Sequence, residues 1–303
     1  MAWVGFASSG ADAPSRPPED LEDTMPTNNP NMSKAQRRDA ARAEALALRE
    51  KEQARDKRNR IITLSVLAVA LVALGVVVWM ILQQGAKKNV DDVPLADVTM
   101  PSTAQENGGI PVGADGAAGT ENAGAPVIDV YLDYMCPVCG QFEQTNAADI
   151  DTMVAAGDAT VVYHPVSILD RLSAGTEYST RSGAAAAYVA DKAPEAFPAF
   201  HAALFTNQPA ENSEGLTDEQ LASYAEEAGA PAEVASAIED GTARETFGQY
   251  VFSATNAATA DEALQNPQSK SFGTPTVVVD GTRFDGWGTQ GALGEAVTAA
   301  AGS

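Results

Sequence analysis

The sequence predicts an α/β domain with a helical insertion, preceded by a single transmembrane helix. Three patterns support this prediction: a strand–helix–strand arrangement over residues 127–164, a run of helical patterns from about residue 176 to 264, and an uncharged apolar stretch at residues 61–82. Two strands around one helix form a βαβ unit, in which the strands pair in parallel. We therefore expect a membrane-associated N-terminal part and a globular C-terminal part.

The first 60 residues fall into two segments of different composition. Residues 1–32 are rich in proline, asparagine and acidic residues and have no hydrophobic period, which predicts a disordered extension. Met32 begins a stretch typical of a protein start, and our hypothesis is that the natural chain starts there rather than at Met1. Residues 33–60 hold ten Lys/Arg against five Asp/Glu and favour a basic cytoplasmic helix, which is either solvated or in contact with anionic lipid headgroups.

The uncharged stretch at residues 61–82 reads IITLSVLAVALVALGVVVWMIL. A helix of its 22 residues is ~33 Å long, enough to cross the ~30 Å hydrocarbon core of a bilayer. A cleaved signal peptide has a shorter apolar region followed by a small-residue cleavage site, so we expect an uncleaved single-pass anchor. Seven Lys/Arg lie within the 20 residues before the stretch and two within the 20 after it. The positive-inside rule then places the N-terminus in the cytoplasm and the C-terminal domain outside the cell membrane, in an oxidising compartment.

The remaining sequence is a linker followed by an acidic domain. Residues 83–107 are polar and mixed, with two prolines, which predicts a linker. From residue 89 onward there are 31 Asp/Glu and six Lys/Arg, so the domain predicted over residues 108–303 is strongly acidic. Such a surface has few cations to neutralise phosphates, and we therefore expect no nucleic-acid partner.

Strand and helix signals follow one another through residues 108–303. β-Branched and aromatic residues indicate strands, and the dipeptide Asp280-Gly281 is a strong hairpin signal. The expected order is a short edge strand at 108–113, a strand at 127–132, a helix over about 137–155, a strand at 160–164, the helical insertion over about 176–264, a hairpin of strands at 276–279 and 282–284, and a final helix at 290–301.

The chain has two cysteines, Cys136 and Cys139, separated by Pro137 and Val138. At the start of a helix, residues i and i+3 share one face and are close enough for a disulfide. Because a ring this short constrains little of the unfolded chain, the pair suits a redox switch better than a structural crosslink. Unpaired N–H groups and the helix dipole stabilise a thiolate at a helix N-terminus. This predicts Cys136 as the nucleophile and a more buried Cys139 as the resolving thiol.

Two motifs carry a resemblance to a known family. The segment from Asp133 to Cys139, DYMCPVC, resembles the D-Y-x-C-P-x-C signature of the DsbA-like branch of the thioredoxin superfamily. About 135 residues later, the segment GTPT from Gly273 to Thr276 resembles the one that carries the cis-proline of this family. A helical insertion separates the two motifs, as in the family. The resemblance covers roughly residues 108–303 and implies a thioredoxin-like fold.

The resemblance also implies how such a site works. Cys136 and Cys139 would exchange a disulfide with thiols of exported proteins, and a quinone-linked membrane partner would reoxidise them. The peptide bond before Pro275 would be cis, and backbone groups of Thr274 would bind an extended substrate peptide by strand addition.

The sequence departs from the family pattern at two positions. Many relatives carry an acid six positions before the first cysteine, where this chain has Val130. Asp129 points to the other face of the strand, and we expect Asp133, which lies nearer the pair, to be solvated. The other departure is Val138, which stands where some relatives have histidine and brings no cation to favour the thiolate. We therefore expect a weaker oxidant than those relatives.

His164 and His201 are the only histidines of the chain. Together with the two cysteines they could formally provide four zinc ligands, but their spacing matches no zinc pattern. We expect no metal and no cofactor, and histidines that pack in the core or lie on the surface.

We predict from these patterns a membrane-anchored thiol–disulfide oxidoreductase that oxidises thiols of exported proteins. Two alternatives stay open from the sequence. One is a reductase or isomerase, in which the pair is kept reduced. The other is a peptide-binding, chaperone-like module that uses the region around Pro275, with the Cys136–Cys139 disulfide only structural.

Overall fold

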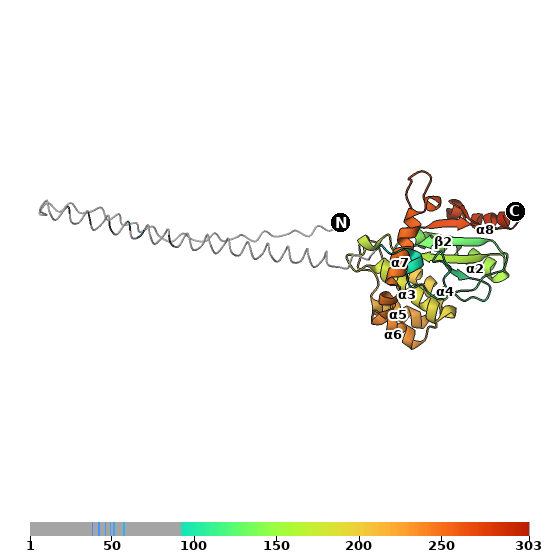
Figure 1. Cartoon of the computed structure of the whole chain (residues 1–303), viewed down its shortest axis with the longest axis horizontal. Helices are drawn as coiled ribbons and strands as arrows, with labels where there is room; N and C mark the ends of the chain where they lie inside the picture. The colour runs from blue at the N-terminus through green and yellow to red at the C-terminus, as the bar shows by residue number, and fades with distance from the viewer. Residues whose placement is uncertain are drawn as a thin grey trace, which may run out of the picture. The chain divides into compact units, whose positions relative to one another are not determined.

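The computed structural model describes residues 92–302 and six isolated residues of the N-terminal part. The chain divides into two compact units, Met1–Lys87 and Lys88–Ser303, and the labelled elements in Figure 1 belong to the second. The six isolated residues lie within the segment over residues 33–60 and are helical and exposed: Arg38, Arg42, Leu46, Arg49, Lys51 and Lys57.

Two predicted segments lie outside the described residues. These are the extension over residues 1–32 and the transmembrane helix over residues 61–82, and residues 83–91 of the predicted linker lie outside them as well. Among the residues that the structure does describe, none belongs to a helix long and apolar enough to cross a membrane.

A mixed five-stranded sheet forms the centre of the second unit, with strand order β1-β3-β2-β4-β5. The strands are β1 (Ile110–Val112), β2 (Val127–Leu132), β3 (Thr160–Pro165), β4 (Thr276–Val279) and β5 (Thr282–Arg283). β2 and β3 are parallel, with Val127 opposite Thr160, which confirms the predicted βαβ unit. The pairs β1–β3, β2–β4 and β4–β5 are antiparallel.

The helices surround this sheet and include the predicted insertion. The α-helices are α2 (Pro137–Ala156), α3 (Tyr178–Lys192), α4 (Phe197–Thr206), α5 (Asp218–Glu227), α6 (Ala232–Glu239), α7 (Thr242–Ala260) and α8 (Ala292–Ala301). Short 3-10 helices are η1 (Leu95–Asp97), η2 (Asp170–Leu172), η3 (Pro194–Ala196), η4 (Glu262–Leu264) and η5 (Gly286–Gly288). Helices α3 to α7 lie between β3 and β4 in the chain and form the insertion. In Figure 1, α5 and α6 lie at the opposite end of the unit from α8.

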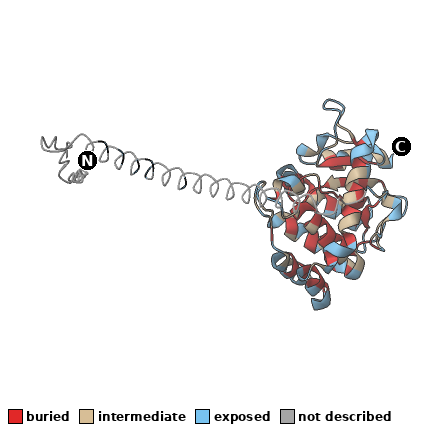
Figure 2. Cartoon of the chain, turned by 60° about the vertical axis from the view of Figure 1, so that its left-hand side comes forward, coloured by how far each residue is buried: buried red, intermediate tan, exposed pale blue. Residues whose placement is uncertain are grey.

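The central strands carry the core. Alternate residues of β2, Ile128, Val130 and Leu132, are buried and join the same apolar cluster as Phe142 and Ile150 of α2. All six residues of β3 are buried, since this strand has a neighbour on each edge and helices on its faces. Figure 2 shows the buried residues concentrated in the interior of the unit. The core thus holds β2 in place, and β2 leads directly into the cysteine pair.

Residues 92–107, predicted as part of a linker over residues 83–107, instead pack against the helical insertion. Leu95, Val98 and Met100 contact an apolar cluster that α3 and α7 bury. The linker prediction was wrong for this stretch. Its composition shows only isolated apolar residues, and the surface that receives them exists only after α3 and α7 have packed together.

Hydrogen bonds also attach this segment to α7. Ser253 Oγ donates to Val93 O at 2.7 Å, and Tyr250 Oη donates to Gly108 O at 2.5 Å. Tyr250 and Gly108 are both buried, so water cannot replace this second bond. The segment from residue 92 to 108 is therefore an integral part of the domain.

We expect Tyr250→Phe to lower the free energy of unfolding by about 1–3 kcal/mol, because it removes the donor from a buried carbonyl. Tyr188→Phe is the matched control, since the half-buried Tyr188 packs against the same cluster; its effect should stay below about 0.5 kcal/mol. Urea unfolding of the full chain measures both. Equal losses in the two variants would contradict the role of the Tyr250 hydroxyl.

Candidate active site

Cys136 and Cys139 lie where β2 passes into α2. β2 ends at Leu132, and a turn with a 2.9 Å hydrogen bond from Cys136 N to Asp133 O leads into the helix. Cys136 is the N-cap of α2 and Pro137 is its first residue. Proline suits this position because the first N–H groups of a helix have no partner within it. Both cysteines are free thiols in this structure, with Cys136 6% exposed and Cys139 1% exposed.

The two thiols have opposite acidities. Hydrogen bonds from the Cys139 thiol, and from the backbone N–H groups of Cys139 and Val138, lower the pKa of Cys136 to about 6 against the effect of burial. Burial and the neighbouring Cys136 sulfur raise the pKa of Cys139 well above its ordinary value. The reduced pair therefore consists of a thiolate at Cys136 and a thiol at Cys139 near neutral pH.

The start of β4 completes the site. β4 pairs with β2 antiparallel, with Thr276 opposite Tyr131, which brings the residues before Thr276 to the end of β2 where the cysteines lie. The Thr274–Pro275 peptide bond is cis. Cys136 Sγ lies 3.4 Å from Thr274 O, a contact in which only the protonated thiol can donate a hydrogen bond. The structure thus places Thr274 and Pro275 beside the cysteine pair, although 138 residues separate Cys136 from Thr274.

Pro137 and Val138 are the exposed members of the motif. Val138 is 41% exposed and is one of two large exposed hydrophobic residues among those that the structure describes. It follows Pro137 in the first turn of α2, two residues after Cys136. An apolar side chain here can contact a substrate but adds no positive charge near the thiolate.

A family model described as thioredoxin matches residues 113–299, which is more than half of the chain. The chain belongs to the thioredoxin family. Oxidised DsbA of Mycobacterium tuberculosis is 32% identical, with a TM-score of 0.52 over 64% of this chain and 93% of that one. MdbA of Actinomyces oris, a thiol-disulfide oxidoreductase, is 26% identical, with a TM-score of 0.54 over 69% of this chain and 94% of that one. The chemistry of this thioredoxin-family site is accordingly thiol–disulfide exchange between cysteine pairs.

A curated relative of this thioredoxin-family chain is much longer. The serine/threonine-protein kinase PknE of Mycobacterium tuberculosis is 36% identical over 148 residues, which are 48% of this chain and 26% of the kinase. The chain therefore spans about a quarter of the length of this relative.

Asp133 differs from its prediction. It was expected to be solvated, but it is fully buried. Its carboxylate accepts hydrogen bonds from Met135 N and Leu169 N, both at 2.9 Å. The prediction was wrong because the segment after β3, which carries Leu169, closes over the turn that holds Asp133. Burial raises the pKa of Asp133 to about 7, while the two backbone donors act in the opposite direction.

Two residues of the insertion also contact the cysteine turn, and the sequence did not predict either of them as a site residue. Gln208 Nε2 donates to the carbonyls of Tyr134 and Cys136. His201 Nδ1 lies 3.0 Å from Tyr134 Oη, and its Nε2 lies 3.3 Å from a carboxylate oxygen of Glu143 on α2. His201 is buried, consistent with the predicted packing role. Both residues are far from the motif in sequence, and no local pattern marks them.

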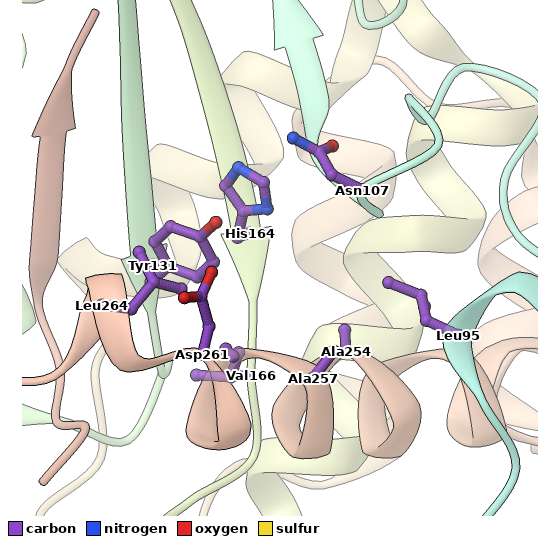
Figure 3. A pocket seen from close by; sticks show the side chains of 10 residues that line it. Leu95, Asn107, Tyr131, His164, Val166, Ala254, Ala257, Asp261 and Leu264 are labelled. Carbon is purple, nitrogen blue, oxygen red and sulfur yellow. The ribbon is translucent and has the colours of Figure 1, made fainter. Parts of the chain in front are cut away.

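His164 lines a cavity between the sheet and α7. Its ring stacks on Tyr131 at 4.1 Å, and its Nε2 lies 2.9 Å from Asp129 Oδ1. Figure 3 shows Tyr131, His164 and Asp261 lining this cavity of about 180 Å³. Burial, with the carboxylates of Asp129 and Asp261, raises the pKa of Tyr131. Within the described part of the chain, no group of three or more His, Cys, Asp or Glu residues is arranged to hold a metal ion.

The reduced chain should be alkylated at Cys136 with a pH profile centred near pH 6, because the thiolate is the reactive form. Cys139 should react far more slowly at neutral pH, since its pKa is raised. Iodoacetamide modification followed by mass spectrometry measures both rates, and Cys136→Ser is the control. A profile centred near pH 9 would contradict the stabilised thiolate.

We expect Asp133→Asn to remove a pH-dependent contribution to stability. The pKa of this carboxyl is about 7 in the folded chain and 3.8 ordinarily, so its protonated form stabilises the fold at low pH, and that stability is lost as the pH rises through 7. The unfolding free energy of the wild type should therefore fall relative to Asp133→Asn, by on the order of a few kcal/mol, between about pH 4 and pH 7. Asp158→Asn, at an exposed carboxylate, is the matched control. A difference in unfolding free energy between the wild type and Asp133→Asn that stays the same from pH 4 to pH 7 would contradict this prediction.

Proposed function

We propose that this chain is a membrane-anchored oxidase that introduces disulfides into exported proteins. The observation that carries the oxidising direction is the position of Cys136 at the N-terminus of α2, where hydrogen bonds from Cys139 and Val138 lower the pKa of its thiol to about 6. A stabilised thiolate favours the reduced form of the pair over its disulfide. The disulfide between Cys136 and Cys139 is then an oxidant toward ordinary thiols, whose thiolates lack this stabilisation.

The reaction follows from the asymmetry of the two thiols. A substrate thiolate attacks Cys136 Sγ of the oxidised pair, since Cys136 is the more exposed sulfur. The Cys136–Cys139 bond breaks, and Cys139 leaves as a thiolate that takes up a proton. A second substrate thiolate then attacks the substrate sulfur of the mixed disulfide, and Cys136 leaves as its stabilised thiolate. Two substrate thiols are oxidised to one disulfide, and the two cysteines are reduced.

The substrate would bind beside the pair as an extended peptide. Backbone groups of Thr274, next to Cys136 Sγ, are placed for strand addition, and Val138 offers an exposed apolar contact. Main-chain recognition depends little on side chains, so the site suits many protein substrates. This supports exported proteins with exposed thiols as the substrate class.

Location and reoxidation complete the proposal. The hydropathy of residues 61–82 and the excess of Lys/Arg before them support a single-pass anchor with the domain outside the cytoplasm. Each catalytic cycle leaves the pair reduced, so an electron acceptor must regenerate the disulfide. A quinone-linked membrane protein fits this need, because an anchored domain stays near the bilayer. The matches to DsbA of Mycobacterium tuberculosis and MdbA of Actinomyces oris support the thiol–disulfide exchange chemistry of the proposal.

Trapping the thiols in intact cells tests this proposal. Cells are quenched with acid and treated with a mass-tagging alkylating agent, which reports the oxidised fraction of the Cys136–Cys139 pair. We expect a mostly oxidised pair that dithiothreitol reduces readily, and loss of oxidase activity toward a reduced model protein in Cys136→Ser. A mostly reduced pair would favour a reductase or isomerase, and a pair that resists reduction would favour a structural disulfide; either result would contradict the proposal.

A further inference from the structure

We propose that Gln208 is a positioning residue for thiol–disulfide exchange, which holds the backbone on both sides of Met135 and thereby fixes the Cys136 sulfur at the N-terminus of α2. The inference requires exchange chemistry at Cys136. It does not depend on the direction of that exchange.

The contacts of Gln208 carry the inference. Its Nε2 donates to Cys136 O at 2.8 Å and to Tyr134 O at 3.1 Å. A single amide group thus spans the turn between β2 and α2. Cys136 O also accepts the first hydrogen bond of α2, from Gly140 N at 3.2 Å. The Cys136 carbonyl is therefore held from two directions, by the helix and by Gln208.

This arrangement affects the thiolate through two physical routes. The sulfur of Cys136 accepts from the N–H groups of Val138 and Cys139, and these bonds require a fixed orientation of the Cys136 backbone. Gln208 provides that orientation. In addition, a carbonyl oxygen near a thiolate opposes its negative charge, and an N–H donor bound to that oxygen reduces the opposition.

Gly140 supports the assignment independently. A Cβ atom on Gly140 would lie 2.5 Å from Gln208 Oε1, closer than such atoms approach one another. Glycine inside a helix costs about 1 kcal/mol relative to alanine, so its presence in the first turns of α2 needs a local reason. The close passage of the Gln208 amide over α2 supplies that reason. Gly140 and Gln208 therefore form a matched pair.

The insertion holds Gln208 in place. Gln208 follows α4, which ends at Thr206, and its backbone N donates to Phe205 O at 3.3 Å. His201 of the same helix contacts Tyr134 Oη and the Glu143 carboxylate. Helix α4 is thus attached to the cysteine turn and to α2 at separate points, which limits where the Gln208 side chain can lie.

The first test replaces the amide while keeping the length of the side chain. In Gln208→Met, we expect the pKa of Cys136 to rise by about half a unit to one unit, equivalent to the loss of one net hydrogen bond. Its alkylation rate at pH 6 should fall about threefold, and the equilibrium with glutathione should shift toward the disulfide form by a similar factor. Asn207→Ala is the matched control, because Asn207 is exposed and its Nδ2 donates to Ala203 O of α4 rather than to the cysteine turn. It should leave both values unchanged.

The second test is a double-mutant cycle between Gly140→Ala and Gln208→Ala. If the added methyl group acts by displacing the Gln208 amide, each single variant should raise the pKa of Cys136, and the double variant should resemble Gln208→Ala alone. Additive shifts would overturn the inference. So would a lower melting temperature with an unchanged pKa and glutathione equilibrium, since that pattern marks a merely structural residue.

These outcomes are separate from those of the cell-trapping experiment. A pair found reduced in cells, together with a raised Cys136 pKa in Gln208→Met, would refute the oxidase direction and leave the positioning role intact. An oxidised pair with no effect of Gln208→Met on the pKa would refute the positioning role alone.

Discussion

The chemistry of this protein depends on one placement, that of the Cys136 sulfur at the N-terminus of α2. There the sulfur receives hydrogen bonds from the Cys139 thiol and from backbone N–H groups, which together outweigh the cost of burying a negative charge. Three elements of the domain position the groups around this sulfur. β2 leads into the turn that carries Cys136, α2 provides the N–H donors, and the residues before β4 place Thr274 O 3.4 Å from the sulfur.

Burial divides the roles of two chemically identical side chains. Cys139 is 1% exposed and its pKa is raised, whereas Cys136 is 6% exposed with its pKa lowered. Burial is the largest cause of the raised pKa of Cys139, whereas the hydrogen bond that the Cys139 thiol donates is the largest cause of the lowered pKa of Cys136. The Cys136 sulfur is therefore both the more accessible of the two and the better leaving group. Asp133 is a further buried titratable group at this turn.

The helical insertion is more than a cover for the sheet. Its helix α4 reaches the cysteine turn through His201, and the loop after α4 does so through Gln208. Its helix α7 binds the segment from residue 92 to 108, so the ordered domain begins before the family match at residue 113. The insertion thus joins the N-terminal segment and the active-site turn to one packed unit.

The sequence alone determined the βαβ unit, the insertion, the hairpin and the cysteine motif, because strand composition, turn dipeptides and the C-P-V-C spacing are local signals. It could not place Asp133, Gln208 or residues 92–107, because burial and contacts between distant segments are not encoded in any local pattern. Asp133 was expected in solvent, yet Leu169, 36 residues later, encloses it. Gln208 lies 72 residues from its partner Cys136. The reacting atoms were thus evident from the chain, whereas the groups that hold them were decided only when helices and sheet packed together.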